Sequence, residues 1–169
     1  MREYQASLGN LSKIITTLVI AFMIGFIVML SYRNTVEPRK EFAFATAFGL
    51  FMLMLPVITF FYRPKAYVIT EDALLIKRIA GNYRIPLSVI NSVAAASRED
   101  MRITIRTFGN GGLFGFTGYY RNSRFGRMRW FVTQRQNYLV IETHEGAKFV
   151  ISPDEPEVME DDLQKSLLQ

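Results

Sequence analysis

The sequence predicts a two-helix transmembrane hairpin followed by a small α+β domain. Two apolar runs, residues 14–32 and 42–62, contain no Asp, Glu, Lys, Arg or His, and each has roughly the length of about 20 residues that crosses the bilayer hydrocarbon. After Tyr62 the apolar residues instead fall into short alternating segments, which are typical of strands. A soluble hairpin buried in a larger protein would also be apolar on all sides, and it is the alternative to the membrane hairpin.

The segments around the two runs predict the topology of the hairpin. Residues 1–13 form an N-terminal tail, and the nine residues 33–41, five of them charged, form a short loop between the spans. The first run is expected to remain uncleaved, because its apolar core exceeds the about 7–15 residues of a signal peptide and no small-residue cleavage site follows it. Basic residues close behind the second span favour a cytoplasmic location for both termini; these are Lys77, Arg78 and Arg84.

Residues 66–169 fit one small domain of about seven short strands closed by a C-terminal helix. The expected strands are 67–69, 74–76, 82–85, 101–106, 128–133, 138–142 and 148–151. Glu71-Asp72 and His144-Glu145-Gly146 are the turns of two hairpins, and residues 87–93 close a turn onto the next strand. The last helix begins with Asp154 as its cap and Pro156 just inside. Its apolar face consists of Val158, Met159, Leu163 and Leu167.

The composition provides no recognisable active site. The chain has no cysteine, which excludes disulfides, thiol nucleophiles and Cys-ligated metals. Its single histidine, His144, falls at a predicted hairpin turn. The glycines of residues 109–115 match neither a dinucleotide-binding nor a phosphate-binding loop. We therefore expect no catalytic residues, no cofactor, no metal and no enzymatic activity.

Several short motifs occur in the order of a known family. Residues 67–70 (YVIT), 85–87 (IPL) and 90–93 (INSV) precede a long insertion that begins at residue 109 and ends near residue 131. This arrangement resembles the bacterial pleckstrin-homology-like (PH-like) domain proteins, and the insertion is similar to a branch seen in Bacteroidetes-type bacteria. The resemblance implies a half-open seven-stranded barrel or sandwich plugged by the C-terminal helix, in a multi-pass protein of the bacterial inner membrane. Lys77-Arg78 echoes the inositol-phosphate signature only loosely, so phosphoinositide binding is not implied.

The segment from residue 108 to residue 131 is the candidate binding site. Glycines, aromatic residues and arginines alternate there, and residues 101–135 contain seven arginines and no acid. An apolar loop tip flanked by arginines suits a membrane interface or a protein partner. The predicted face comprises Leu113, Phe114, Phe116, Arg121, Arg124, Arg127 and Arg129. The alternatives are that the aromatic residues fill the barrel and that the arginines form a solvated basic surface.

Two functions remain open from the sequence. The first is a non-enzymatic membrane protein whose cytoplasmic domain binds a membrane-protein partner, a second copy of the chain or anionic lipid headgroups. The second is a small integral-membrane enzyme or transporter subunit with a site between the spans, which would need polar groups inside the membrane. Nucleic acid is not an expected partner, because a domain tethered to the bilayer meets anionic headgroups first.

Overall fold

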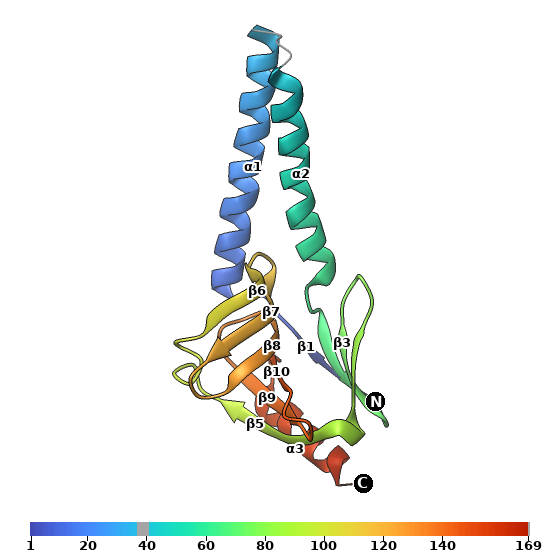
Figure 1. Ribbon diagram of the computed structural model, residues 1–169. Helices are drawn as coiled ribbons and strands as arrows, with labels where there is room; N and C mark the ends of the chain where they lie inside the picture. Colours follow the sequence, from blue (N-terminus) through green and yellow to red (C-terminus); the bar gives the residue numbers. More distant parts are fainter. Residues whose placement is uncertain (37–40, 169) are drawn as a thin grey trace.

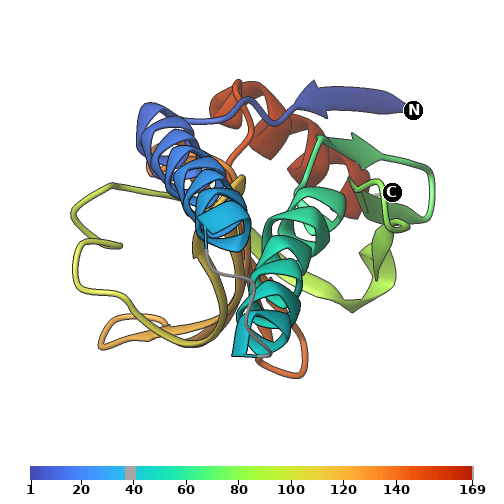
Figure 2. The ribbon, with the colours of Figure 1, turned by 90° about the horizontal axis from the view of Figure 1, so that it is seen from above.

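The computed structural model describes residues 1–36 and 41–168, with the side chains of residues 1–32 and 47–168. Two long helices, α1 (Asn10–Val36) and α2 (Glu41–Tyr62), project from one side of a β-rich domain (Figure 1). Seen along their length, the helices stand next to each other over the domain (Figure 2). The helices extend beyond the predicted bounds, because α1 begins four residues earlier and continues into the predicted loop 33–41. Residues 37–40 of that loop lie outside the described residues.

Only the first helix has the full length of a membrane span within the described residues. Its segment Asn10–Tyr32 has 23 residues and a mean hydropathy of 2.6, whereas the described apolar part of α2, Ala47–Tyr62, is shorter. A signal sequence would also satisfy this criterion. Side chains of both helices face outward, including Leu18 (65% exposed), Phe22 (74%) and Phe51 (58%). The described part of the hairpin is therefore not buried in the protein.

The domain consists of two sheets. One has the strand order β1-β2-β3-β4 and the other β5-β9-β10-β8-β7-β6, and all pairs are antiparallel except β10 with β8. The strands are β1 (Arg2–Gln5), β2 (Ala66–Ile69), β3 (Ala73–Lys77), β4 (Tyr83–Pro86), β5 (Ile90–Ala96), β6 (Ile105–Gly112), β7 (Gly115–Asn122), β8 (Gly126–Val132), β9 (Tyr138–Thr143) and β10 (Lys148–Ile151). The two hairpins predicted at residues 67–76 and 138–151 are present.

The described residues contain ten strands, so the prediction of seven is wrong. Residues 2–5 of the predicted tail form β1, which pairs with β2. Residues 90–93, which were predicted to belong to a turn, begin β5, and the glycine-rich insertion contains β7. The strand expected at 101–106 begins only at Ile105. Its apparent alternation was misleading, because Ile103 and Ile105 are both mostly exposed.

Two apolar clusters pack on opposite faces of the six-stranded sheet. Successive residues of a strand point to opposite faces, so Phe131 belongs to the cluster under the four-stranded sheet and Trp130 to the other. Helix α3 (Pro156–Leu167) packs against the first cluster through Met159 and Leu163, both fully buried. Leu167 is only partly buried against this cluster.

Two predictions for α3 are wrong. Val158 is 52% exposed and does not belong to the buried face. Asp154 does not cap the helix, since the residue at the cap position is Glu155 and it makes no capping bond through its side chain. The Asp154 carboxylate instead accepts hydrogen bonds from the backbone N–H and the hydroxyl of Ser7. It thereby holds the segment between β1 and α1 against the domain.

Candidate functional site

The tip of the β6–β7 hairpin lies between the two long helices. Leu113 and Phe114 form its turn. The backbone N–H of Phe114 donates to the Thr16 hydroxyl of α1 at 2.9 Å, and the Phe114 ring meets the Phe60 ring of α2 edge-on with 5.2 Å between centroids. The predicted apolar loop tip is therefore packed within the protein and is not free to bind a partner. The turn joins the domain to both helices.

Local contacts hold this turn in shape. The Asn110 side-chain amide donates to the carbonyl of Gly115 at 2.8 Å, and its oxygen accepts from the Leu113 N–H at 3.2 Å. Phe114 has a φ of 57°, a left-handed conformation that costs about 1–2 kcal/mol for a residue with a side chain. Arg63 covers the aromatic pair, with its guanidinium carbon 4.6 Å from the centre of the Phe60 ring. Contacts on both sides of the turn thus stabilise a strained residue.

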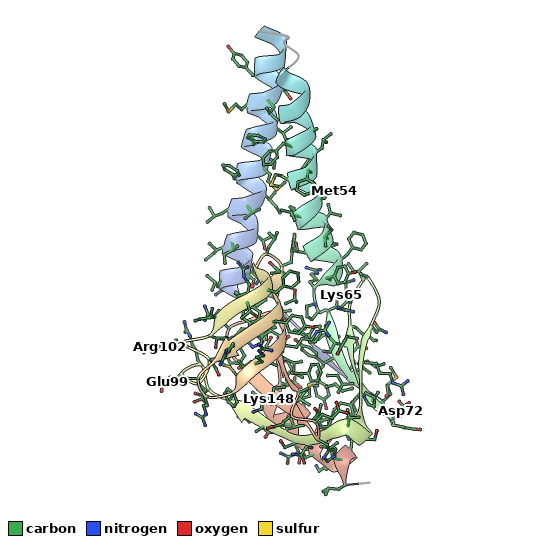
Figure 3. The ribbon with its side chains drawn as sticks, viewed as in Figure 1. Met54, Lys65, Asp72, Glu99, Arg102 and Lys148 are labelled. Carbon is green, nitrogen blue, oxygen red and sulfur yellow. The ribbon has the colours of Figure 1, made fainter. Side chains whose placement is uncertain are left out.

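The structure separates the predicted binding face into different surfaces. Phe116 is 6% exposed and belongs to the cluster around Trp130. Arg121 and Arg127 are exposed and face each other at the far end of β7 and β8, about seven residues and therefore roughly 20 Å along the strand from the tip. Arg124, in the β7–β8 turn, forms an ion pair with Asp100. This end of the domain lies to the side, near the loop where Glu99 and Arg102 are labelled in Figure 3.

Arg129 occupies a different position from the other three arginines. It is half-buried, its guanidinium carbon lies 4.4 Å from the centre of the Tyr83 ring, and its Nη1 donates to the Tyr83 hydroxyl at 3.2 Å. Arg78, from the β3–β4 connection, packs against the same ring at 6.0 Å and against the Tyr62 ring of α2 at 5.4 Å. Both guanidinium groups also lie within 6 Å of the Phe131 ring. The fold thus brings two cations together beside the end of α2.

Among the described residues, no acid compensates the charges of these two arginines. Within the part of the chain that the structure describes, neither forms an ion pair, whereas Arg2, Arg84 and Arg124 pair with Asp162, Asp72 and Asp100. Burial, followed by the repulsion from Arg129, lowers the pKa of Arg78 below its ordinary value. A negative group placed between the two guanidiniums would relieve this repulsion.

A cleft of about 680 Å³ opens beside the two arginines, between the last turns of α2 and the sheet formed by β6, β7 and β8. Leu55, Ile58 and Tyr62 line it from the helix, and Arg78, Arg106 and Arg129 line it from the domain. The β3–β4 connection is held against the helix, since the Ala80 N–H donates to the Phe61 carbonyl at 3.0 Å. Sequence reasoning used Arg78 only as evidence for orientation and as part of a loose echo of the inositol-phosphate signature. Its nearness to Arg129 could not be predicted, because it depends on this tertiary contact.

A second cavity of about 340 Å³ lies between α1 and α2. Its lining is apolar and includes Phe22, Phe26, Met52, Leu53 and Pro56. Leu55 and Leu113 line both this cavity and the arginine cleft. The two spaces are therefore neighbours that meet at these side chains.

The described residues include no group of three or more His, Cys, Asp or Glu side chains placed to hold a metal ion. His144 is exposed at the β9–β10 turn, as its place in the sequence predicts. Among the acids of α3, Asp162 binds Arg2 and the Tyr4 hydroxyl. Burial, followed by the hydrogen bond to Asp162, raises the pKa of Tyr4 to about 12. These contacts connect β1 to α3.

The fold defines the chain as an apolar N-terminal helical segment joined to a β-rich domain with a C-terminal helix. A family model described as "Bacterial PH domain" matches residues 65–167. The chain belongs to this family, and the resemblance noted in the sequence is confirmed at that level. Neither the curated proteins nor the solved structures include a significant match.

Proposed function

We propose that this chain is a non-enzymatic integral protein of the bacterial inner membrane. In this proposal α1 and α2 both cross the bilayer, and they hold the PH domain at the cytoplasmic surface as a binding module for anionic lipid. The glycine-rich β6–β7 segment, which resembles the Bacteroidetes-type branch of the family, contributes the turn that fixes the domain to the helices.

The pairing of β1 with β2 argues against a single crossing. β1 precedes α1, β2 follows α2, and the two strands pair from Arg2 opposite Ile69 to Gln5 opposite Ala66. If only α1 crossed the membrane, the two strands would lie on opposite sides and could not pair. The sheet is therefore compatible with two crossings or with none. Cleavage of α1 as a signal sequence would also remove Tyr4 and Ala6 from the core.

The outward surface of the helices favours two crossings over none. Leu18, Phe22 and Val28 of α1 are each more than 60% exposed, and Phe51 and Met54 of α2 nearly as much. Met54 points away from the helix pair in Figure 3. A contiguous apolar surface of this kind is unusual on a soluble protein, whereas lipid tails would cover it without cost.

The position of the arginine cleft favours lipid as the ligand of the module. Arg78 and Arg129 lie beside Tyr62, the last residue of α2, and therefore at the level where the helix would leave the bilayer. A basic residue near an anionic membrane surface contributes about 1 kcal/mol. A cytoplasmic domain is consistent with this location, since anionic lipids give that leaflet its negative surface potential.

A protein partner or a second copy of the chain is the second candidate ligand. β6 is an edge strand of its sheet, and it exposes Ile105 (68%) and Phe108 (75%). An unpaired edge with apolar side chains suits strand addition by a partner. An enzyme or transporter site between the spans has less support, because the cavity between the helices is lined by apolar side chains.

Cysteine labelling tests the topology cleanly, because the chain has no cysteine of its own. Single cysteines at Gln5 and Glu145 should react from the cytoplasmic side of intact cells or vesicles, and a cysteine at Asn34 from the opposite side. Alkaline carbonate should leave the protein in the membrane. Labelling of Gln5 and Glu145 from opposite sides, or release by carbonate, would refute the proposal.

A further inference from the structure

We infer that the cleft beside Arg78 and Arg129 binds one anionic phospholipid from the surrounding bilayer. Its phosphate lies between the two guanidinium groups, and an acyl chain follows the apolar wall of α2 into the cavity between the helices. This inference rests on the proposed membrane insertion, and it names the ligand and the site of the binding module.

The arginines offer the hydrogen-bond donors that a phosphate needs. A guanidinium carries about five N–H donors. In the described residues Arg78 uses Nε to bind the Gly81 carbonyl, and Arg129 uses Nη1 to bind the Tyr83 hydroxyl. The remaining donors of both groups have no partner among the described residues, and the stacking on Tyr83 and Phe131 orients the two planes. Arg–phosphate bonds are charge-assisted and often bidentate.

The shape of the site favours a lipid over a free phosphate ion. Leu55 and Ile58 line the cleft next to the arginines, and Leu55 together with Leu113 also lines the apolar cavity between α1 and α2. A phosphate ion would fill only the charged end of these two neighbouring spaces. A phospholipid has a charged group and an apolar chain in the same order, from the end of α2 towards its middle.

The experiment measures lipid bound to the full chain in a zwitterionic detergent by native mass spectrometry. Phosphatidylglycerol is the probe, phosphatidylcholine tests the role of the headgroup charge, and inorganic phosphate tests a free-anion site. The cleft variant is Arg78→Gln/Arg129→Gln. The matched control is Arg121→Gln/Arg127→Gln, which removes the same charge from the exposed far end of the sheet.

We expect one phosphatidylglycerol per chain in the parent and in the control. In the cleft variant the fraction of chains with bound phosphatidylglycerol should be at least tenfold lower. Phosphatidylcholine should bind at least tenfold more weakly than phosphatidylglycerol. A second variant, Ile58→Trp, fills the cleft from a half-exposed position on α2 and should also lower occupancy. The fluorescence of Trp130, the only tryptophan of the parent chain, verifies the fold of the arginine variants, and circular dichroism verifies the fold of Ile58→Trp.

Four results would overturn the inference. Equal losses in the cleft and control variants would indicate nonspecific attraction to surface charge. Equal binding of the two lipids would show that the arginines do not discriminate between the anionic and the zwitterionic headgroup. Displacement of phosphatidylglycerol by an equal concentration of inorganic phosphate would indicate a free-anion site. If carbonate extracts the parent chain, the proposed function fails, whereas a membrane-integral chain without bound lipid refutes only this inference.

Discussion

Removing the Tyr4 side chain should strongly destabilise the domain, although Tyr4 precedes the residues that match the family model. Tyr4 is 7% exposed and belongs to the main core cluster, and its hydroxyl donates to the Asp162 carboxylate of α3. Truncation of a buried aromatic residue to alanine costs about 3–5 kcal/mol. Tyr4→Phe keeps the ring and loses one hydrogen bond, so its cost should be about 1 kcal/mol.

The assay is urea unfolding of the full chain in detergent, followed by Trp130 fluorescence. Trp130 is 1% exposed and stacks on Tyr120 with 4.4 Å between ring centroids, so unfolding exposes it to water. Glu3→Gln is the control, because Glu3 and its partner Lys77 are partly exposed and such a pair contributes at most about 1 kcal/mol. If Tyr4→Ala unfolds at the same midpoint as the parent, β1 is not part of the folded domain. The topological argument for two membrane crossings would then lose its basis.

Three further predictions use the same unfolding assay. Tyr67→Phe should lower the free energy of unfolding by about 1–3 kcal/mol. The fully buried Tyr67 hydroxyl donates to the Phe131 carbonyl at 2.6 Å and accepts from the Ser152 N–H at 3.2 Å. A variant as stable as the parent would contradict this role. Gly118→Ala should destabilise the domain far more than Gly126→Ala. A Cβ on Gly118 would lie 2.3 Å from the Phe108 carbonyl oxygen, whereas a Cβ on Gly126 meets nothing within 4 Å. Equal effects would argue against the close approach of β6 and β7. Hydrogen bonds from Arg2 and Tyr4 hold the pKa of Asp162 below its ordinary value of 3.8. The contribution of Asp162 to stability is therefore present above that value and declines as the pH falls through the folded pKa. Asp162→Asn should flatten this decline of stability at acid pH, and an unchanged pH profile would refute the linkage.

Local signals predicted the elements that depend on local contacts. The hairpins at residues 67–76 and 138–151 have short turns between alternating segments, and α3 has Pro156 at its first turn. β1 could not be predicted in this way, since its partner β2 lies about 60 residues later in the chain. β7 was missed because glycine is rare in strands. Here Gly118 faces Gly109 across the β6–β7 pair, where a side chain would strike the neighbouring backbone.

Sequence proximity also grouped residues that the fold places apart. The turn residue Phe114 and the arginines at 121 and 127 are close in the chain, but they lie at opposite ends of a strand that is about 25 Å long. Arg129 is the one predicted arginine that falls between these ends, opposite Tyr119. Its counterpart Arg78 comes from the β3–β4 connection in the other sheet. Only the tertiary fold brings these two arginines together.

The β6–β7 turn also explains why a cavity exists between the helices. Gly49 allows α2 to approach α1 closely, since even a Cβ there would lie 3.3 Å from Leu30 and Phe26. Nearer to the domain the helices diverge (Figure 1), and Leu113 and Phe114 occupy the space between them. The same turn therefore separates the helices, lines the apolar cavity and borders the arginine cleft. A molecule that fills both spaces would contact the anchor and the PH domain together, which a domain on a flexible linker could not provide.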